Sequence, residues 1–228
     1  MPADRRVRWG YHELTEPWAH RLVKGAGIRP GELVMDIGAG QGSITAHLID
    51  VGARIIAVEL HPARAGRLRQ RFGSSIVVVE ADAADLRLPR QPFKVVANPP
   101  FGITTGLFRR LLGRNSRLSS ADVVVPAHVA ARLASGRAPG ADRWTASYRA
   151  HVAARLPARA FRPPAPMATS VLRIDRHSRT AADPNAPPQA HGPGDASQRL
   201  ECAADRKTLW GTPNVVTGRE RDPLPGRP

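Results

Sequence analysis

The chain has 228 residues, 42% hydrophobic content and a formal net charge of +15, which suffices for one domain with a sizeable core. Its single cysteine, Cys202, excludes a disulfide framework and a cysteine-rich zinc site, and no apolar run is long enough to span a bilayer. The arginine-rich excess favours an acidic polymer such as nucleic acid as partner, although a GC-rich genome also inflates arginine.

Apolar runs alternate with amphipathic segments along most of the chain. Strands are predicted at 32–38, 54–60, 75–82, 93–100 and 121–127, and helices at 42–52, 61–72, 104–113 and 128–135. Continuous apolar strands that alternate with helices indicate an α/β fold, with a parallel sheet covered on both faces. The last two runs, 148–155 and 170–176, are predicted to close the sheet as an antiparallel pair.

The periodicity ends near Ser178, which predicts two regions. Residues 1–178 form the folded domain, whereas residues 179–228 hold eight of the 22 prolines and lack sustained periodicity. We expect this tail to be mostly disordered, because it cannot bury enough apolar surface to offset its ordering entropy. The N-terminal stretch "MPADRRVRWG" has no apolar core behind its basic residues, so it is no signal peptide, and we expect a cytoplasmic protein.

The stretch "DIGAGQG", residues 36–42, follows the first predicted strand and opens a helix. Its spacing, D-x-G-x-G-x-G, differs from the G-x-G-x-x-G of dinucleotide-binding loops. The carboxylate of Asp36 suits a ligand that carries an ammonium group and no phosphate. S-adenosylmethionine (SAM) is such a ligand, and Gly38 and Gly40 let the backbone approach it closely.

Acidic residues also end the next two predicted strands. Glu59 can bind both ribose hydroxyls, with Leu60 against the adenine ring. Asp82 can accept from the adenine amino group, with Ala83 supplying a backbone contact. Each acid has an ordinary alternative, a solvated strand end for Glu59 and a helix N-cap for Asp82. Three acids at successive strand ends nevertheless share the edge where open α/β sheets bind ligands, which predicts a SAM site.

The motif "NPPF", Asn98 to Phe101, ends the fourth predicted strand in a rigid corner. The exocyclic N6 of adenine is a poor nucleophile, because its lone pair is delocalised into the ring. Asn98 Oδ1 and the Pro99 carbonyl can accept both N6 hydrogens and turn the lone pair toward a methyl group, while Phe101 stacks on a flipped-out base. The alternative is a plain proline turn.

Taken together, these motifs resemble those of SAM-dependent rRNA adenine N6-methyltransferases. Within that group the sequence is most similar to the Erm macrolide-resistance methyltransferases of actinobacteria, over about residues 8–176. The resemblance lies in "GELVMDIGAGQGSITAHL", "AVELHP", "ADA", "VVANPPFGITT" and "FRPPAPMATSVLRI", which stand in the family's order and spacing. "NPPF", where the housekeeping small-subunit enzymes usually carry "NLPY", favours the resistance branch.

The resemblance implies a Rossmann-like methyltransferase with a mostly parallel seven-stranded sheet, SAM as cofactor and no metal. It implies N6-methylation of an adenine in 23S rRNA before ribosome assembly is complete, by a monomer, with macrolide, lincosamide and streptogramin B resistance as the result. Two alternatives stay open. One is methylation of 16S rRNA or another nucleic-acid adenine, and the other is a catalytically degenerate RNA-binding homologue.

The resemblance also assigns residues that the strand ends do not. "YHEL" stands at the family's upstream motif, so His12 and Leu14 are expected near SAM. Phe161 is expected to wall the adenine pocket for RNA, or to be a core anchor. The sequence departs from the family pattern at Tyr11, Glu13, Pro126 and Ala168.

Family members usually carry a helical C-terminal domain, and we expect it to be absent here, because the proline-rich tail begins directly after "SVLRIDR". RNA binding is therefore expected to rest on residues 1–178, through one of three patches: the N-terminal "RRVR", the predicted helix that carries Arg64, Arg67, Arg69 and Arg71, and the segment "FRRLLGRNSR", which is the first choice. The alternative for each patch is a solvated helix face. The candidate arginines of the first and last patches are Arg5, Arg6, Arg8, Arg109, Arg110, Arg114 and Arg117.

Overall fold

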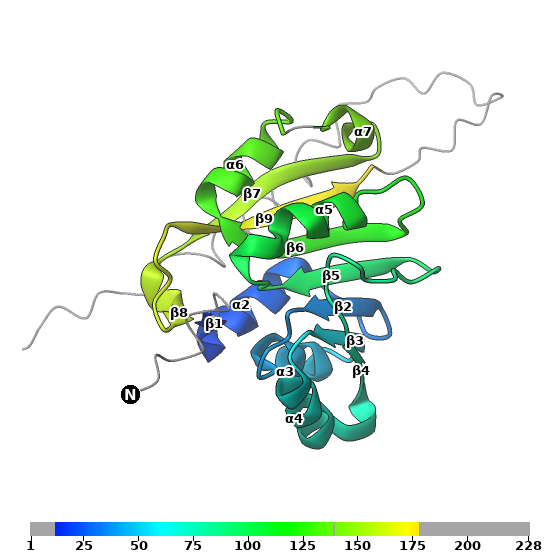
Figure 1. Ribbon diagram of the computed structural model, residues 1–228, viewed down its shortest axis with the longest axis vertical. Helices are drawn as coiled ribbons and strands as arrows, with labels where there is room; N and C mark the ends of the chain where they lie inside the picture. Colours follow the sequence, from blue (N-terminus) through cyan, green and yellow to red (C-terminus); the bar gives the residue numbers. More distant parts are fainter. Residues whose placement is uncertain (1–11, 139, 178–228) are drawn as a thin grey trace, which may run out of the picture. The chain divides into compact units, whose positions relative to one another are not determined.

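The computed structural model describes residues 12–138 and 140–177, shown in colour in Figure 1. The chain divides into two compact units, 1–189 and 190–228, and all described residues belong to the first. The predicted tail at 179–228 and the candidates Arg5, Arg6, Arg8 and Tyr11 lie outside the described residues.

A seven-stranded sheet in the order β4-β3-β2-β5-β6-β9-β7 organises the domain (Figure 1). The five strands from β4 to β6 are parallel, whereas β9 is antiparallel to both β6 and β7. The predicted α/β fold, the mostly parallel sheet and the closing antiparallel pair are therefore confirmed. The strands are β2 (Leu33–Ile37), β3 (Arg54–Glu59), β4 (Ile76–Glu80), β5 (Phe93–Ala97), β6 (Leu118–Pro126), β7 (Tyr148–Leu156) and β9 (Thr169–Arg176).

Helices connect the parallel strands. Because the chain moves one way from β2 through β3 to β4 and the other way from β5 to β6, right-handed crossovers put α3 and α4 on the opposite face from α5. The connection from β4 to β5, residues 81–92, holds no helix. The helices are α2 (Glu16–Ala26), α3 (Ser43–Asp50), α4 (Pro62–Phe72), α5 (Thr104–Leu111), α6 (Ala127–Ala134) and α7 (Asp142–Thr145), with 3-10 turns η1 (Gly73–Ser75), η2 (Phe101–Ile103) and η3 (Ala158–Ala160).

Helix α2 is an element that the strand and helix pattern above leaves out. Thr15 precedes it in an extended conformation, a proline stands in its first turn, and Gly27 ends it at φ 59°. Its buried face includes Trp18 and Leu22, one turn apart, and α2 packs against α3. Proline at the start and glycine at the end are recognisable helix boundaries, so the signals were present in the sequence.

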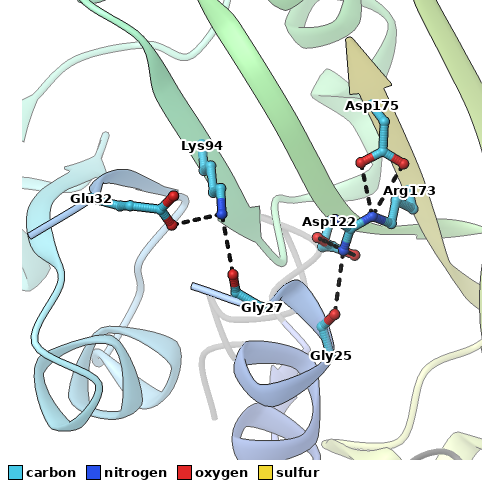
Figure 2. A network of polar contacts seen from close by, with 7 residues as sticks. All are labelled: Gly25, Gly27, Glu32, Lys94, Asp122, Arg173 and Asp175. Atoms are coloured by element: carbon cyan, nitrogen blue, oxygen red, sulfur yellow. Dashed lines mark hydrogen bonds and ion pairs between the residues drawn. The ribbon is translucent and has the colours of Figure 1, made fainter. Parts of the chain in front are cut away.

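Two cations from the sheet hold the C-terminal end of α2 (Figure 2). Lys94 Nζ donates to the Gly27 carbonyl at 3.2 Å and pairs with Glu32 at 2.6 Å. Arg173 Nη1 donates to the Gly25 carbonyl at 3.3 Å and pairs with Asp122 at 3.0 Å. Cations at a helix C-terminus satisfy its free carbonyls and complement its dipole, so this network fixes where α2 ends.

The Asp122–Arg173 pair lies inside the sheet, with the two residues 3% and 8% exposed. Burial by itself lowers the pKa of the Arg173 guanidinium, but the carboxylates of Asp122 and Asp175 raise it further, so its net shift is upward. Arg173 therefore stays charged, and removing it would leave a carboxylate in the interior without this partner.

Candidate functional site

The glycine-rich loop and the "NPPF" corner meet at the carboxyl ends of the two central strands. β3 and β4 lie on one side of β2 and β6 lies beyond β5, so strand order reverses between β2 and β5. Open α/β sheets bind ligands outside the strand ends at such a switch point. Gly38 has φ 75°, and a Cβ there would lie 3.1 Å from Pro99 Cα. Only glycine fits this conformation and this contact, so the two motifs form one site.

Glu59 is a buried part of the site. It is 5% exposed, so the alternative of a solvated strand end is wrong. Its Oε2 accepts from the Gly40 backbone N–H at 2.9 Å, and its Oε1 accepts from the His61 N–H at 2.8 Å. Each oxygen keeps a second lone pair that a ribose hydroxyl can use. Leu60, the next residue, is 47% exposed and offers an apolar surface for an adenine ring.

Asp82 follows β4 on the surface, and its Oδ1 accepts from the Ala84 N–H at 2.8 Å. The side chain thus caps a short turn at residues 83–85 rather than a helix. Because Asp82 is exposed, its second oxygen remains accessible to an adenine amino group. Ala83 is 5% exposed, so its side chain lies in the core and only its backbone can contact a ligand.

Asp36 lies beneath the glycine-rich loop, completely buried. Oδ2 accepts from the Thr45 hydroxyl at 2.6 Å, and Oδ1 is buried without a hydrogen-bond partner among the described residues. Burial raises the pKa of this carboxyl to about 7; the Thr45 hydrogen bond opposes the shift, and the charge of Glu59 adds to it. A direct contact between Asp36 and a ligand ammonium would require the loop to move, so that contact stays a prediction.

Asn98 is oriented by a contact that no motif reveals. Its Nδ2 donates to the His12 carbonyl at 2.7 Å, across 86 residues of chain. This bond identifies which side of the amide is the donor and leaves Oδ1 to accept from another group. Phe101 is the first residue of η2. Its ring stacks on the His12 ring, with centroids 6.3 Å apart and planes inclined by 19°. "YHEL" and "NPPF" are therefore in direct contact.

A small second sheet holds His12 in place. β1 (Glu13–Leu14) pairs antiparallel with β8 (Phe161–Arg162), and His12 Nδ1 lies 3.1 Å from the Pro163 carbonyl. Leu14 and Phe161 stand opposite each other, 2% and 1% exposed. The expectation that Phe161 contacts RNA is wrong for this structure, because its ring is a core anchor. Leu14 likewise supports the site from within.

Two of the departures from the family pattern lie side by side. Pro126 is buried at the end of β6, immediately before α6. The carbonyl of Ala168, which is exposed, accepts from the Ala127 N–H at 2.9 Å. Glu13 belongs to β1, where it stands opposite Arg162 of β8.

The arginines after "NPPF" divide into two kinds. Arg110 Nε donates to the Leu86 carbonyl at 2.7 Å, so this side chain is tied to the connection between β4 and β5. Arg109, Arg114 and Arg117 are exposed. Arg110 is exposed as well, so all four can meet RNA phosphates, but among the described residues only Arg110 of the four has a side-chain hydrogen bond to the main chain.

We also searched the described residues for a separate cavity, a metal site and a membrane-spanning helix. A cavity of about 1040 Å³ is lined by β3, β4 and the helix-free connection after β4, and its lining includes neither Gly38, Glu59 nor Asn98. Among residues 12–138 and 140–177, no group of three or more His, Cys, Asp and Glu side chains is placed to hold a metal ion. Within the same ranges, each helix is too short or too polar to cross a membrane.

Comparison with known proteins decides the family. The family model described as ribosomal RNA adenine dimethylase matches residues 6–186. The chain belongs to this family. Ribosomal RNA adenine dimethylases are SAM-dependent, and the cradle of Gly38, Gly40 and Glu59 beside exposed Leu60 fits that cofactor.

Relatives in the family have a common name. The chain is 36% identical over 134 residues to ribosomal RNA small subunit methyltransferase A of Leifsonia xyli, covering 55% of this chain and 47% of the relative. It is 34% identical over 181 residues to the enzyme of that name from Acidobacterium capsulatum, covering 73% and 63%. The chain thus spans about half to two thirds of the length of these two relatives.

A crystal structure of the 23S rRNA methyltransferase ErmE has the same fold, with a TM-score of 0.63, 22% identity, and coverage of 70% of this chain and 67% of that one. At this identity the likeness concerns the fold. Membership of the Erm branch is therefore not confirmed, whereas membership of the wider family is.

Proposed function

We propose that this chain transfers the methyl group of SAM to N6 of an adenine in ribosomal RNA. The observation that carries the proposal is the orientation of Asn98. Its Nδ2 is held by the His12 carbonyl, which leaves Oδ1 to accept a hydrogen bond at the mouth of the cofactor site. An acceptor that is already oriented costs no reorganisation when charge develops on the nitrogen.

The residues of the corner divide the work. Asn98 Oδ1 and the Pro99 carbonyl accept the two N6 hydrogens, which holds the nitrogen nearer tetrahedral geometry and directs its lone pair outward. Phe101, itself stacked on His12, offers a ring for the flipped-out base. SAM supplies an activated methyl group on its sulfonium. The reaction then depends on proximity and acceptor placement. As N6 bonds to the methyl carbon, the C–S bond of the sulfonium breaks, S-adenosylhomocysteine is the leaving group, and N6 afterwards loses one proton to solvent.

On the cofactor side, Glu59 binds the ribose and Asp82 the adenine amino group. The fixed hydrogen bonds from Gly40 and His61 place the Glu59 carboxylate before any ligand arrives. Leu60 covers one face of the adenine. Each of these roles follows from the position of the residue at a strand end.

We propose 23S rRNA as the substrate, with macrolide, lincosamide and streptogramin B resistance as the consequence. "NPPF" in place of "NLPY" supports this choice. Small-subunit rRNA is the second candidate, because the relatives described above are named small subunit methyltransferase A.

The test is methyl transfer from labelled SAM to protein-free 23S and 16S rRNA, with an adenine-free transcript as control. We expect labelling of 23S rRNA and a loss of turnover of about 10²- to 10³-fold in Asn98→Ala, with SAM affinity within a few-fold of wild type. Labelling of 16S rRNA alone would select the second candidate. Equal labelling of the adenine-free transcript would exclude adenine as the acceptor.

A further inference from the structure

Helix α4 contacts both halves of the cofactor site from outside. In its first turn, Arg64 Nη1 lies 3.8 Å from Glu59 Oε1. In its last turn, Arg71 Nη1 donates to the Gln41 carbonyl at 2.8 Å. Gln41 stands between two glycines at the tip of the glycine-rich loop, so this bond joins α4 to the part of the loop that the cofactor must approach.

The Arg71 side chain is held in the orientation that reaches Gln41 by a second contact. Its guanidinium lies over the Phe72 ring, 4.7 Å from the centroid, which orients the donors. The same ring closes the loop from below, because a Cβ on Gly42 would lie 2.5 Å from Phe72 Cε2. Arg71 and Phe72 therefore hold two successive residues of the loop, Gln41 and Gly42.

The loop needs such a support. Gly38, Gly40 and Gly42 all have positive φ, from 59° to 87°, and glycine has more conformations to lose on ordering than any other residue. A donor on the carbonyl between Gly40 and Gly42 restricts the loop to the shape in which Gly40 N–H reaches Glu59. Binding a ligand to an ordered loop costs less than binding it to a loose one.

The positive charge of Arg71 shows that its effect on SAM binding cannot be direct electrostatic attraction. SAM carries a sulfonium and an ammonium against one carboxylate, so a nearby guanidinium repels it by Coulomb's law. We propose that Arg71 is a positioning residue for SAM, acting through the Gln41 carbonyl. The inference rests on the proposed function in that the site binds SAM, and it does not depend on the RNA substrate.

The experiment measures the Kd of SAM by calorimetry without RNA for wild type, Arg71→Ala, Arg71→Lys and the control Arg67→Ala, which removes an exposed arginine from the same helix. Loss of one charge-assisted hydrogen bond predicts a Kd raised about five- to ten-fold in Arg71→Ala. Arg71→Lys keeps a donor and should recover part of the affinity. Arg67→Ala should bind SAM as wild type does or slightly more tightly.

Turnover and melting separate positioning from general damage. For Arg71→Ala we expect KM for SAM to rise while kcat at saturating SAM stays within two-fold, and the ligand-free Tm to stay close to that of Arg67→Ala. Unchanged or tighter SAM binding in Arg71→Ala, an equal loss in Arg67→Ala, or a ligand-free Tm lowered by many degrees would each overturn the proposal. Absence of SAM binding by the wild type would instead overturn the proposed function.

Discussion

Replacing Asp36 with asparagine should change how the stability of the protein depends on pH. Burial raises the pKa of this carboxyl from 3.8 to about 7 in the native state, whereas the unfolded chain keeps the ordinary value. Between these values the native state binds a proton that the unfolded state has released, so the free energy of unfolding falls as pH rises. The stabilising effect of protonation is complete below pH 3.8 and is lost by about pH 7.

The size of the change in the free energy of unfolding follows from the pH interval between the two pKa values of Asp36. Each pH unit inside it changes the free energy of unfolding by about 1.4 kcal/mol, so this carboxyl removes about 2 to 3 kcal/mol between pH 5 and pH 7. Asparagine has the same shape, stays neutral, and can still accept from the Thr45 hydroxyl. The stability of Asp36→Asn relative to wild type should therefore increase by that amount across the same interval.

Guanidinium unfolding followed by circular dichroism at pH 5, 6, 7 and 8 measures the difference. Asp142→Asn, which changes an exposed carboxyl in the short helix α7, is the control and should show no comparable trend. If the curves for Asp36→Asn and wild type ran parallel over this range, the Asp36 carboxyl would already be ionised in the native state. The reasoning from its burial would then be refuted.

Further predictions concern the glycine-rich loop and the RNA surface. Gly38→Ala should lower the free energy of unfolding by about 1 to 3 kcal/mol and abolish tight SAM binding, because its Cβ would press on the Pro99 backbone in addition to the strain of φ 75°. The control Gly31→Ala has φ 79° and nothing within 4 Å of the added Cβ, so it carries only the strain; an equal loss of stability in thermal melts of the two variants would contradict the steric argument for Gly38. Arg109→Ala should flatten the salt dependence of RNA binding by about one contact, roughly 0.7 to 0.9 log units per decade of salt. Arg110→Ala should mainly lower Tm, since its side chain is bonded to the main chain; identical salt slopes for the two variants would disprove the distinction.

Much of the fold could be predicted from the sequence because the sheet is buried on both faces. Strands such as β2, in which all five residues are buried, read as continuous apolar runs that local pattern can locate. The pairing of the two-residue strands β1 and β8 has no such pattern in the sequence. It joins Glu13 to Arg162, and contacts at that sequence separation depend on how the whole domain closes.

The site was predictable to the extent that it is built from strand ends. Glu59 and Asn98 were placed correctly at one edge of the sheet, because parallel strands end on the same side. The burial of Asp36 was not predictable, and for Phe161 the sequence left a core anchor as one of two alternatives, since a motif gives a residue's position along the chain and not what covers it. The bond from Asn98 to the His12 carbonyl likewise involves a main-chain atom, on which the side-chain identity at position 12 has no bearing.

The contact between Arg173 and the Gly25 carbonyl sets an order of events during synthesis on the ribosome. These residues are 148 positions apart, on the first helix and the last strand of the described domain. Helix α2 emerges early, but Arg173, the second of the two cations at its C-terminal end and the partner of Asp122 in β6, is made 148 residues after Gly25. The nascent chain can pair β2 with β3 and then β3 with β4 as these strands appear, whereas β6 lacks its antiparallel neighbour until β9 leaves the exit tunnel. Completion of the sheet therefore has to wait until β9 has left the exit tunnel, and a ribosome stalled before residue 173 would display an open sheet edge and a carboxylate without its guanidinium.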